Sequence, residues 1–545
     1  MNLSPSAHVD GFTRDHLPPA HLWPTLEFTL PELCYPDRLN AAAALLDAPI
    51  AAFGADRPAL CTPDGETWTY GLLRTRANQI AQVLTEDLGL VPGNRVLLRS
   101  PNNPWTIACW LGVLKAGGVV VTTMCALRTR ELGPIAERTK PAVALVDHRF
   151  TEDVYAVQAT VLPELRVVAY GGEGADDLVA RAGAKSGRFA DVATAADDVA
   201  LLGPTSGSTG VPKITMHFHR DLLAIDDTFG RHTLRLNADD VVACSAPLAF
   251  TFGLGMLVVF PLRAGACALL TEAATPDQLA RIVERQGVTV LATAPTAYRA
   301  ILRAGRVKSL AGLRIGVSAG EHIPSDTWER LRETIGLRVI DGIGATELLH
   351  IFISAAGEEI RPGATGKPVP GYRAAILGPD ECELGPGETG RLAVVGPVGC
   401  RYLDDSRQRG YVVDGWNLTG DVFHRDEDGY YHYHARGDDM IVSSGYNIGG
   451  PEVEAAIETH PDVLECAVVG RPDSERGSVV CAFVVLRPGA NGGSAKAREI
   501  QDHVKQTLAP YKYPRDVRFC DGLPRNASGK LQRFALLETV REESP

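Results

Sequence analysis

Short apolar runs alternate with longer stretches of helical spacing over most of the first 300 residues. Residues 105–116 have the apolar spacing of a helix, and a β-branched run at 118–122 follows them directly. Strands that alternate with helices pair in parallel, because the helix carries the chain back to the end of the sheet at which the previous strand began. The alternation therefore predicts an α/β fold. We expect further helices at 31–47 and 69–88, and further strands at 94–99, 141–146, 241–246, 266–270 and 288–292.

The 545 residues are too many for one hydrophobic core, since such cores stop growing at roughly 250–300 residues. After residue 363 the pattern changes to short strands with turns, at 374–377 and 391–395, which favours antiparallel pairing. A second change follows Arg436, where glycine and charged residues predict an exposed hinge at 436–439. We predict a large domain over 1–436 and a small α+β domain over 437–545. Its helices are expected at 451–459 and 497–508, and its strands at 463–469 and 479–486.

Composition and charge exclude several classes of function. Hydrophobic residues make up 45% and charged residues 22% of the chain, as in ordinary globular enzymes. The formal charge of -12 argues against general affinity for nucleic acid or anionic membrane, which requires a basic face. We expect no signal peptide in residues 1–30 and no run approaching the ~18 apolar residues of a membrane-spanning helix. Eleven cysteines without a Cys-x-x-Cys pair indicate small buried thiols in a reducing cytoplasm.

A loop rich in serine and glycine follows the apolar run 199–202. Its glycines let backbone amides approach a phosphate, its hydroxyls add donors and its lysine adds charge. It is not a Walker P-loop, because Pro212 precedes the lysine and Ile214 stands where a magnesium-binding Ser or Thr is required. By composition alone, a solvated surface loop is the alternative. The candidate phosphate-binding residues are Thr205, Ser206, Gly207, Ser208, Thr209, Gly210 and Lys213.

The order of residues in this loop resembles the signature of the adenylate-forming superfamily, which includes acyl-CoA synthetases, peptide synthetase adenylation domains and firefly luciferase. Residues 341–347 resemble a second motif, which implies that Thr346 contacts phosphate and that Glu347 holds Mg²⁺. Ile343 departs from the tyrosine of many members, which leaves no aromatic ring at that position to pack on adenine. The resemblance implies a catalytic role for Thr346 and Glu347, and ATP binding by Gly320, Glu321, Asp341, Gly342 and Ile343.

Further motifs follow in the order that the superfamily would have. Thr419-Gly420-Asp421 and Arg436 resemble the ribose-binding residues, and Asp438 falls at the hinge about which the small domain of the superfamily rotates. Ser444, Gly445 and Tyr446 resemble the segment that lines the pantetheine tunnel, where glycine suits close passage of a thiol arm. Lys530, in the loop 524–530, resembles the catalytic lysine. Taken alone, each of these motifs is also compatible with an ordinary turn or a solvated loop.

The acid-binding residues look most like those of benzoate-CoA and 2-aminobenzoate-CoA ligases, as do the N-terminal segments 21–24 and 35–40. Thr251 and Phe252 stand where the benzoate branch would have Ala and Tyr. A hydroxyl at Thr251 favours a ring bearing an amino or hydroxyl group, and Phe252 would stack on that ring without donating a hydrogen bond. His350 either orients the carboxylate or is a packed core histidine. The expected pocket comprises Ala246, Thr251, Phe252, Gly253, Ala319, Gly344, His350 and Ile351.

The resemblance implies a cytoplasmic aryl acid:CoA ligase that uses ATP, Mg²⁺ and coenzyme A. The enzyme would form an acyl-adenylate from a benzoate-type acid, with 2-aminobenzoate favoured, and then the aryl-CoA thioester. A homodimer is the family-level expectation. In one alternative the acceptor is the phosphopantetheine arm of a carrier protein, and a basic patch including Arg471 or Arg476 would instead favour CoA. A catalytically inactive nucleotide-binding regulator is an alternative of another class, and the presence of Lys213, Glu347 and Lys530 argues against it.

Overall fold

A computed structural model describes residues 3–205, 212–320, 323–443, 446–473, 476–508, 510–525, 529 and 531–542. The chain forms two compact units. The first comprises Met1–Ala374 and Val394–Asn417, and the second comprises Ala375–Ala393 and Leu418–Pro545. Residues 375–393 and 418–436, which the sequence pattern assigned to the large domain, therefore pack with the C-terminal part. The division into packing units does not test whether the small domain rotates about residues 436–439, so the hinge stays a prediction.

A six-stranded sheet in the order β6-β5-β3-β4-β7-β8 forms the core of one half of the first unit. Its strands pair in parallel except for β8, which runs antiparallel to β7. Leu97 and Val146 on the sheet pack against Leu132 and Val157 on two helices. The strands are β3 (Arg95–Arg99), β4 (Val119–Thr123), β5 (Val143–Asp147), β6 (Arg166–Tyr170), β7 (Val199–Thr205) and β8 (Lys213–Phe218). The helices of this half are α3 (Tyr70–Gln82), α4 (Pro104–Lys115), α5 (Thr129–Thr139), α6 (Glu152–Thr160), α7 (Leu178–Gly183) and α8 (His219–Ile225).

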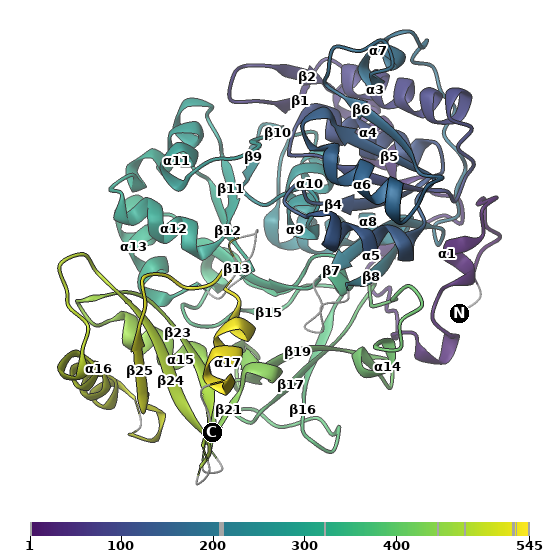
Figure 1. The fold of residues 1–545 in the computed structure, drawn as a ribbon. Coiled ribbons are helices and arrows are strands. Elements are labelled where there is room, and N and C mark those ends of the chain that lie inside the picture. The colour runs from purple at the N-terminus through teal and green to yellow at the C-terminus, as the bar shows by residue number, and fades with distance from the viewer. Residues whose placement is uncertain are drawn as a thin grey trace. The chain divides into compact units, whose positions relative to one another are not determined.

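A nine-stranded sheet in the order β15-β14-β13-β12-β11-β9-β10-β1-β2 forms the other half. Six neighbouring strands of this sheet are parallel, namely β13, β12, β11, β9, β10 and β1. The strands β2, β14 and β15 pair antiparallel at its two edges. Helices α11, α12 and α13 lie along one side of these strands (Figure 1), where Val283, Ile301 and Leu331 pack on Leu291 and Val339. The strands are β1 (Pro58–Cys61), β2 (Thr67–Thr69), β9 (Val241–Cys244), β10 (Cys267–Leu269), β11 (Val290–Thr293), β12 (Ile315–Ser318), β13 (Val339–Gly344), β14 (Ile351–Ser354) and β15 (Lys367–Pro368). The helices are α9 (Thr251–Leu254), the π-helix η7 (Gly255–Val259), α10 (Phe260–Ala264), α11 (Pro276–Arg285), α12 (Pro295–Arg303) and α13 (Ser325–Ile335).

Local chemistry sets where these helices begin. The Asn103 side chain accepts a hydrogen bond from the Thr106 amide, and Pro104 occupies the first helical position of α4. Thr275 and Gln278 cap α11 reciprocally. Side-chain acceptors of this kind satisfy amides that have no partner within the helix, and proline costs nothing at the first position because its missing amide would be unpaired there.

Antiparallel pairing dominates the rest of the chain. One sheet has the order β16-β17-β19-β18 with β20 on β19, and the other has the order β22-β21-β24-β23 with β25 on β24. Ile457, Val468 and Val484 belong to the core of the second of these sheets and its helices. The strands are β16 (Arg373–Leu377), β17 (Thr389–Val395), β18 (Val412–Val413), β19 (Trp416–Arg425), β20 (Tyr431–Arg436), β21 (Ile441–Ser443), β22 (Tyr446–Ile448), β23 (Val463–Asp473), β24 (Gly477–Leu486) and β25 (Asp516–Phe519). The helices are α15 (Gly450–Glu458), α16 (Ser494–Thr507) and α17 (Arg533–Glu542).

The predicted α/β class with an antiparallel part and a small α+β part is confirmed, but the helix expected at 31–47 is wrong. A 3-10 turn at Pro31–Leu33 is followed by irregular chain, and the helical conformation begins only at Ala41. Pro36 explains the difference, because proline lacks an amide hydrogen and pushes the residue before it out of the helical region. The Asn40 side chain then accepts from the Ala42 amide and opens the helix.

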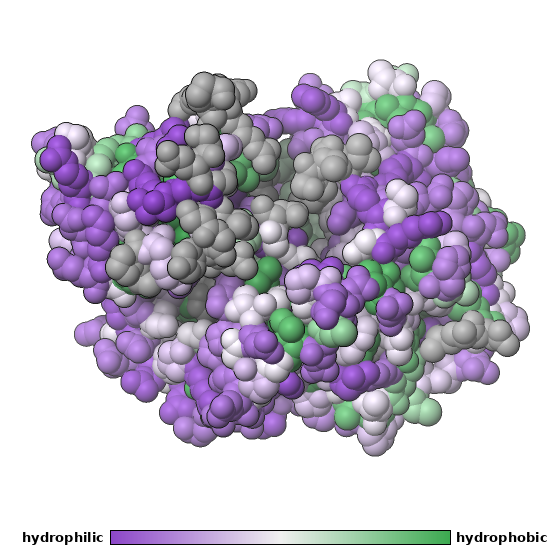
Figure 2. Space-filling model, turned by 90° about the horizontal axis from the view of Figure 1, so that it is seen from below, coloured by the Kyte–Doolittle hydropathy of each residue, from purple (hydrophilic) through white to green (hydrophobic). Residues whose placement is uncertain are grey.

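The surface and the cysteines agree with the composition, with two exceptions. The face shown in Figure 2 is mostly hydrophilic, with hydrophobic residues scattered across it. None of the described helices combines the length and the apolar character that crossing a bilayer requires. All eleven cysteines are free thiols. Six are buried and three are partly buried, but Cys34 and Cys382 are exposed, contrary to the expectation that the cysteines are buried.

Candidate functional site

The predicted acid-binding residues gather where parallel strands of the nine-stranded sheet end. Ala246 follows β9, Ala319 follows β12, and Gly344 is the last residue of β13. The hydroxyl groups of Ser245 and Thr293 lie 2.6 Å apart and join the ends of β9 and β11. The carboxyl edge of a parallel sheet is where α/β folds place ligands, because the loops there leave an open crevice. The sequence therefore brings these separated residues to one edge.

The turn between β13 and β14 carries residues predicted to bind phosphate or magnesium and residues predicted to bind the acid. The short 3-10 helix Thr346–Leu348 lies between the strands, and Leu349 takes a positive φ of 68° before His350. Gly344 pairs with Ile351 across the strands, and a Cβ on Gly344 would lie 2.8 Å from the His350 carbonyl oxygen. Any larger residue at Gly344 would push the two strands apart. The backbone thus holds Thr346 and Glu347 beside His350.

Lys213 and Glu347 meet through a tyrosine that the sequence motifs did not identify. The Tyr402 hydroxyl donates to Glu347 Oε1 at 2.5 Å and accepts from Lys213 Nζ at 3.2 Å, and Lys213 Nζ lies 5.2 Å from the centre of the tyrosine ring. Glu347 is buried. Burial and the neighbouring Glu347 carboxylate raise the pKa of Tyr402, so its hydroxyl keeps its proton. Its partners are 55 and 189 residues away in the chain, so no local pattern marks this tyrosine.

A buried histidine supports the backbone of the same turn. His217 Nε2 lies 2.8 Å from the Thr346 carbonyl oxygen and 3.0 Å from Thr215 Oγ1. Because a carbonyl oxygen only accepts, Nε2 carries the hydrogen. Burial, with a smaller effect of the Arg401 charge, lowers the pKa of His217 to about 3. The imidazole is therefore neutral at physiological pH and holds Thr346 in place as a fixed donor.

His350 lies within a group of phenylalanine rings. It stacks on Phe252 at 5.7 Å between ring centres, meets Phe260 edge-on at 4.7 Å and lies 5.3 Å from Phe229. Burial lowers the pKa of His350 to about 3, against a smaller opposite effect of the Phe252 backbone. Among the residues that the structure describes, neither ring nitrogen has a hydrogen-bond partner of good geometry. A neutral imidazole has one donor and one acceptor nitrogen, and its burial among three rings fits a packed core histidine as well as a role toward the acid.

The loop that carries Thr251 and Phe252 is fixed from the six-stranded half. Asn102 bonds both the Ala246 carbonyl oxygen, at 3.1 Å, and the Leu248 amide, at 2.7 Å. A Cβ on Gly253 would lie 2.2 Å from the Pro247 carbonyl oxygen, so only glycine fits there. Phe229, Phe260 and Asn102 were missed at the level of sequence because they contribute contacts rather than motif residues.

The predicted ribose-binding pair lies in the second unit. Asp421 on β19 and Arg436 on β20 are directly opposite each other, and Arg436 Nη1 donates to Asp421 Oδ1 at 2.9 Å. Asp421 is buried whereas Arg436 is exposed. Gly420 has a positive φ of 79°, which glycine adopts without strain. The ion pair brings the two candidates together, and their role toward ribose stays a prediction.

Comparison with known proteins assigns the family. The family described as AMP-binding enzyme matches residues 47–402, and its C-terminal domain family matches residues 452–530. The chain belongs to the AMP-binding enzyme family. The benzoate-CoA ligase of Thauera aromatica is 35% identical over 519 residues, which cover 93% of this chain and 97% of that protein. The 4-hydroxybenzoate-CoA/benzoate-CoA ligase of Rhodopseudomonas palustris is 32% identical over 92% of this chain and 94% of that protein.

Solved structures agree with this assignment. The crystal structure of the anthranilate CoA ligase AuaEII in complex with anthranoyl-AMP has a TM-score of 0.88 and 31% identity, and the match covers 94% of this chain and 99% of that chain. A benzoate CoA ligase from Burkholderia xenovorans LB400 has a TM-score of 0.82 and 30% identity, with 92% and 100% coverage. The predicted resemblance to the adenylate-forming superfamily is thereby confirmed, and the chain is an enzyme.

Several predicted residues of this AMP-binding enzyme lie outside the described residues or are described only in part. Asp341, Gly342 and Ile343 lie on β13, and Gly320 follows β12 with a positive φ of 90°. The hinge candidate Asp438 belongs to the 3-10 helix Gly437–Asp439, and the tunnel candidate Tyr446 begins β22. Thr205 ends β7 and Lys213 begins β8. Ser206, Gly207, Ser208, Thr209, Gly210, Glu321, Ser444, Gly445 and Lys530 lie outside the described residues.

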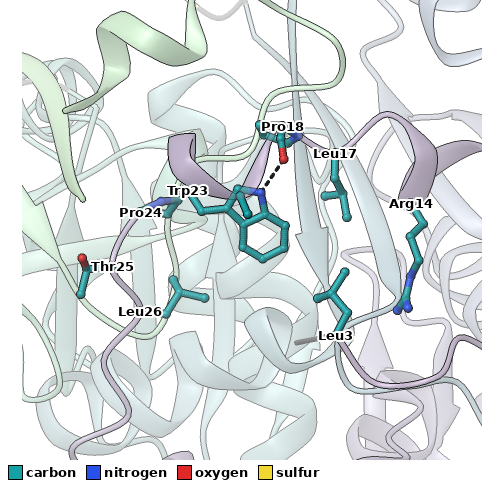
Figure 3. A pocket seen from close by; sticks show the side chains of 9 residues that line it. Leu3, Arg14, Leu17, Pro18, Trp23, Pro24, Thr25 and Leu26 are labelled. Atoms are coloured by element: carbon teal, nitrogen blue, oxygen red, sulfur yellow. Dashed lines mark hydrogen bonds between the residues drawn. The ribbon is translucent and has the colours of Figure 1, made fainter. Parts of the chain in front are cut away.

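A pocket of about 420 Å³ lies in the N-terminal segment of this AMP-binding enzyme, and none of the predicted site residues that the structure describes lines it. Figure 3 shows Trp23 in this pocket, with its indole Nε1 donating to the Pro18 carbonyl oxygen at 2.6 Å. Arg14 at its side forms ion pairs with Asp197 and Asp198. The Trp23 hydrogen bond links the segment 21–24, which is part of the family resemblance, to Pro18, and neither set of contacts adds a chemical group to the candidate site.

Proposed function

We propose that this AMP-binding enzyme is an ATP-dependent aryl acid:CoA ligase, which converts a benzoate-type acid to its CoA thioester with release of AMP and pyrophosphate. One observation carries the proposal. A single turn, from Gly344 to Ile351, holds Thr346 and Glu347 next to a neutral histidine stacked on Phe252. An aromatic acid that lies against His350 would present its carboxylate to a phosphate held by Thr346. That proximity is what adenylation of an acid requires.

In the first step a carboxylate oxygen of the acid attacks the α-phosphorus of ATP. The new bond joins that oxygen to phosphorus, the bond from phosphorus to the bridging oxygen breaks, and pyrophosphate leaves. Negative charge gathers on the phosphoryl oxygens, so fixed cations and donors stabilise the transition state. Lys213 is assigned to the outer phosphates and the Thr346 hydroxyl to the α-phosphate, while Lys530 is assigned to the reacting oxygens by the family resemblance.

The residues present fit a magnesium ion. Mg²⁺ binds through one or two carboxylates together with substrate phosphates and waters, rather than in an all-protein cage. Glu347 supplies a carboxylate, and among the described residues no group of three or more His, Cys, Asp or Glu side chains is arranged to bind a metal. Glu347 would hold the ion. When bound, Mg²⁺ would neutralise charge on the phosphates.

In the second step the thiol of CoA attacks the acyl carbon of the adenylate. A carbon–sulfur bond forms, the bond to AMP breaks and the thiol proton is lost to solvent or base. By resemblance, the small domain turns about Asp438 and exchanges the loop of Lys530 for the segment of Ser444, Gly445 and Tyr446. This rotation is part of the proposal. A cytoplasmic location and a homodimer belong to it as well.

Among benzoates we favour 2-aminobenzoate as the substrate. Thr251 begins α9 and directly precedes Phe252, whose ring stacks on His350. A hydroxyl can accept from an aromatic amine or donate to a phenol, whereas unsubstituted benzoate gives it no partner. The anthranilate CoA ligase AuaEII among the similar structures supports this choice.

The alternative acceptor is the phosphopantetheine arm of a carrier protein. The basic patch that would favour CoA was expected to include Arg471, but Arg471 Nε forms an ion pair with Asp516 at 3.1 Å within the second unit. Arg471 is thus already engaged by an acid. We still favour CoA, because the benzoate and hydroxybenzoate relatives are CoA ligases.

Pyrophosphate release tests the proposal. The purified chain is supplied with ATP, Mg²⁺ and a panel of benzoate, aminobenzoates, hydroxybenzoates and a medium-chain fatty acid, with and without CoA. The proposal expects CoA-dependent turnover of one aromatic acid and an aryl-CoA product by mass spectrometry. Release of pyrophosphate without transfer to CoA favours the carrier-protein alternative. Preference for the fatty acid would contradict the aryl specificity.

A further inference from the structure

One hydroxyl group joins the two charged residues that the proposed function assigns to phosphate and magnesium. A hydroxyl has one hydrogen to donate and lone pairs to accept with. Tyr402 uses both capacities, because Glu347 can only accept its hydrogen and the Lys213 ammonium can only donate to its oxygen. Tyr402 therefore links Lys213, which begins β8, to Glu347, which lies in the 3-10 helix Thr346–Leu348.

Tyr402 itself is held rigidly. It is fully buried, its amide donates to Gln408 Oε1 at 2.9 Å, and its backbone forms a bridge with Thr215 on β8. Tyr411 packs edge-on against its ring at 5.7 Å. Gln408 in turn donates to the carbonyl oxygens of Leu22 and Cys400. A hydroxyl on so well packed a ring has little freedom to move.

We infer that Tyr402 is a positioning residue. Its hydroxyl fixes the positions of the Glu347 carboxylate and the Lys213 ammonium relative to each other before nucleotide and metal bind. The inference rests on the proposed function for the roles of those two residues. Holding Oε1 fixes the rotation of the carboxylate, so less order has to be imposed when an ion binds. Groups that orient a metal ligand typically change metal affinity 10- to 100-fold when they are removed.

The test replaces Tyr402 by phenylalanine in the full chain, which keeps the ring and removes the hydroxyl. Mn²⁺ serves as a paramagnetic substitute for Mg²⁺, and its binding is followed by electron paramagnetic resonance in the presence of a non-hydrolysable ATP analogue. We expect the dissociation constant of Mn²⁺ to rise about tenfold or more. In the pyrophosphate assay, the KM for ATP should rise while the KM for the acid is unchanged.

Tyr411→Phe is the matched control, because Tyr411 lies 5.9 Å from Lys213 Nζ by its ring and packs against Tyr402. This variant should bind Mn²⁺ as the wild type does. If Tyr402→Phe also binds Mn²⁺ and the ATP analogue with wild-type affinity, and only its thermal stability falls, Tyr402 has a purely structural role and the inference is overturned.

A second variant covers the case in which Tyr402→Phe does not fold. Incorporation of 3,5-difluorotyrosine at position 402 retains ring and hydroxyl but makes the hydroxyl a more acidic donor, so Mn²⁺ affinity should shift while the fold is preserved. An unchanged affinity would contradict the inference. The binding experiment needs no acid, so its failure is distinguishable from failure of the proposed function: a chain that adenylates no aromatic acid would still show the shift in Mn²⁺ affinity.

Discussion

Replacing Gly255 by alanine should displace His350 and thereby weaken binding of the acid. Gly255 begins the π-helix η7, and a Cβ there would lie 2.5 Å from His350 Cδ2, 2.6 Å from Nε2 and 2.9 Å from Phe260 Cε2. Carbon atoms pack at about 3.5–4.0 Å, so the imidazole has to move by about 1 Å. Overpacking of this kind costs about 1–3 kcal/mol, and alanine recovers about 0.5–1 kcal/mol of helix propensity. From the middle of each range we expect a net loss of about 1 kcal/mol.

The assay measures urea unfolding together with the KM values for 2-aminobenzoate and for ATP. In Gly255→Ala the KM for the acid should rise several-fold and the KM for ATP should stay near the wild-type value. Gly183→Ala at the end of α7 is the control, since among the described residues nothing lies within 4 Å of its Cβ position. It should leave both KM values unchanged and should not lower the unfolding free energy. If Gly255→Ala is destabilised but the KM for the acid is unchanged, His350 does not face the acid. A fully stable variant would refute the packing argument itself.

Two further predictions concern selectivity and pH. In Thr251→Ala the ratio of kcat/KM for 2-aminobenzoate to that for benzoate should fall about two- to tenfold, the size of one neutral hydrogen bond, and an unchanged ratio would remove the basis for the aminobenzoate assignment. Burial lowers the pKa of His219 to about 3, whereas the unfolded value is near 6.5. The folded state is therefore not penalised at pH values well above 6.5, and it loses stability as the pH falls toward 3, by about 1.4 kcal/mol between pH 7.5 and 5.5. His219→Asn keeps an acceptor for the Ala41 amide. Between pH 7.5 and 5.5 this variant should lose less unfolding free energy than the wild type, by the amount given above. If the variant and the wild type show the same pH dependence, the assignment to His219 is contradicted.

The sequence predicted the elements whose signal is local. The helix α4 and the strand β4 were found from apolar spacing, because side-chain periodicity follows from the geometry of each element. The helix that apolar spacing predicts over residues 31–47 does not form as one element, because Pro36 interrupts it. The division into packing units also differed, since residues 375–393 pack with a part of the chain that follows much later.

In the candidate site, sequence motifs identified the residues that carry charges or hydroxyl groups. The residues that hold them in place were identified only from contacts in the structure. Glu347 and Lys213 could be named from their motifs, but the hydroxyl that joins them belongs to Tyr402, far from both in the chain. The aromatic neighbours Phe229 and Phe260 of His350 were likewise invisible, because a phenylalanine in an apolar run gives no sign of which ring it will meet. Long-range contacts of this kind exist only after the fold has formed.

The fate of oxygen atoms tests the central claim, that the acid is activated as an adenylate, most directly. The chain is incubated with ATP, Mg²⁺, CoA and 2-aminobenzoate labelled with ¹⁸O in its carboxylate, and the products are analysed by mass spectrometry. Attack of the carboxylate on the α-phosphorus leaves one labelled oxygen on AMP when the thiol displaces it. The account predicts AMP heavier by one ¹⁸O atom and an aryl-CoA that retains the other. Label in inorganic phosphate, with ADP as the nucleotide product, would contradict it.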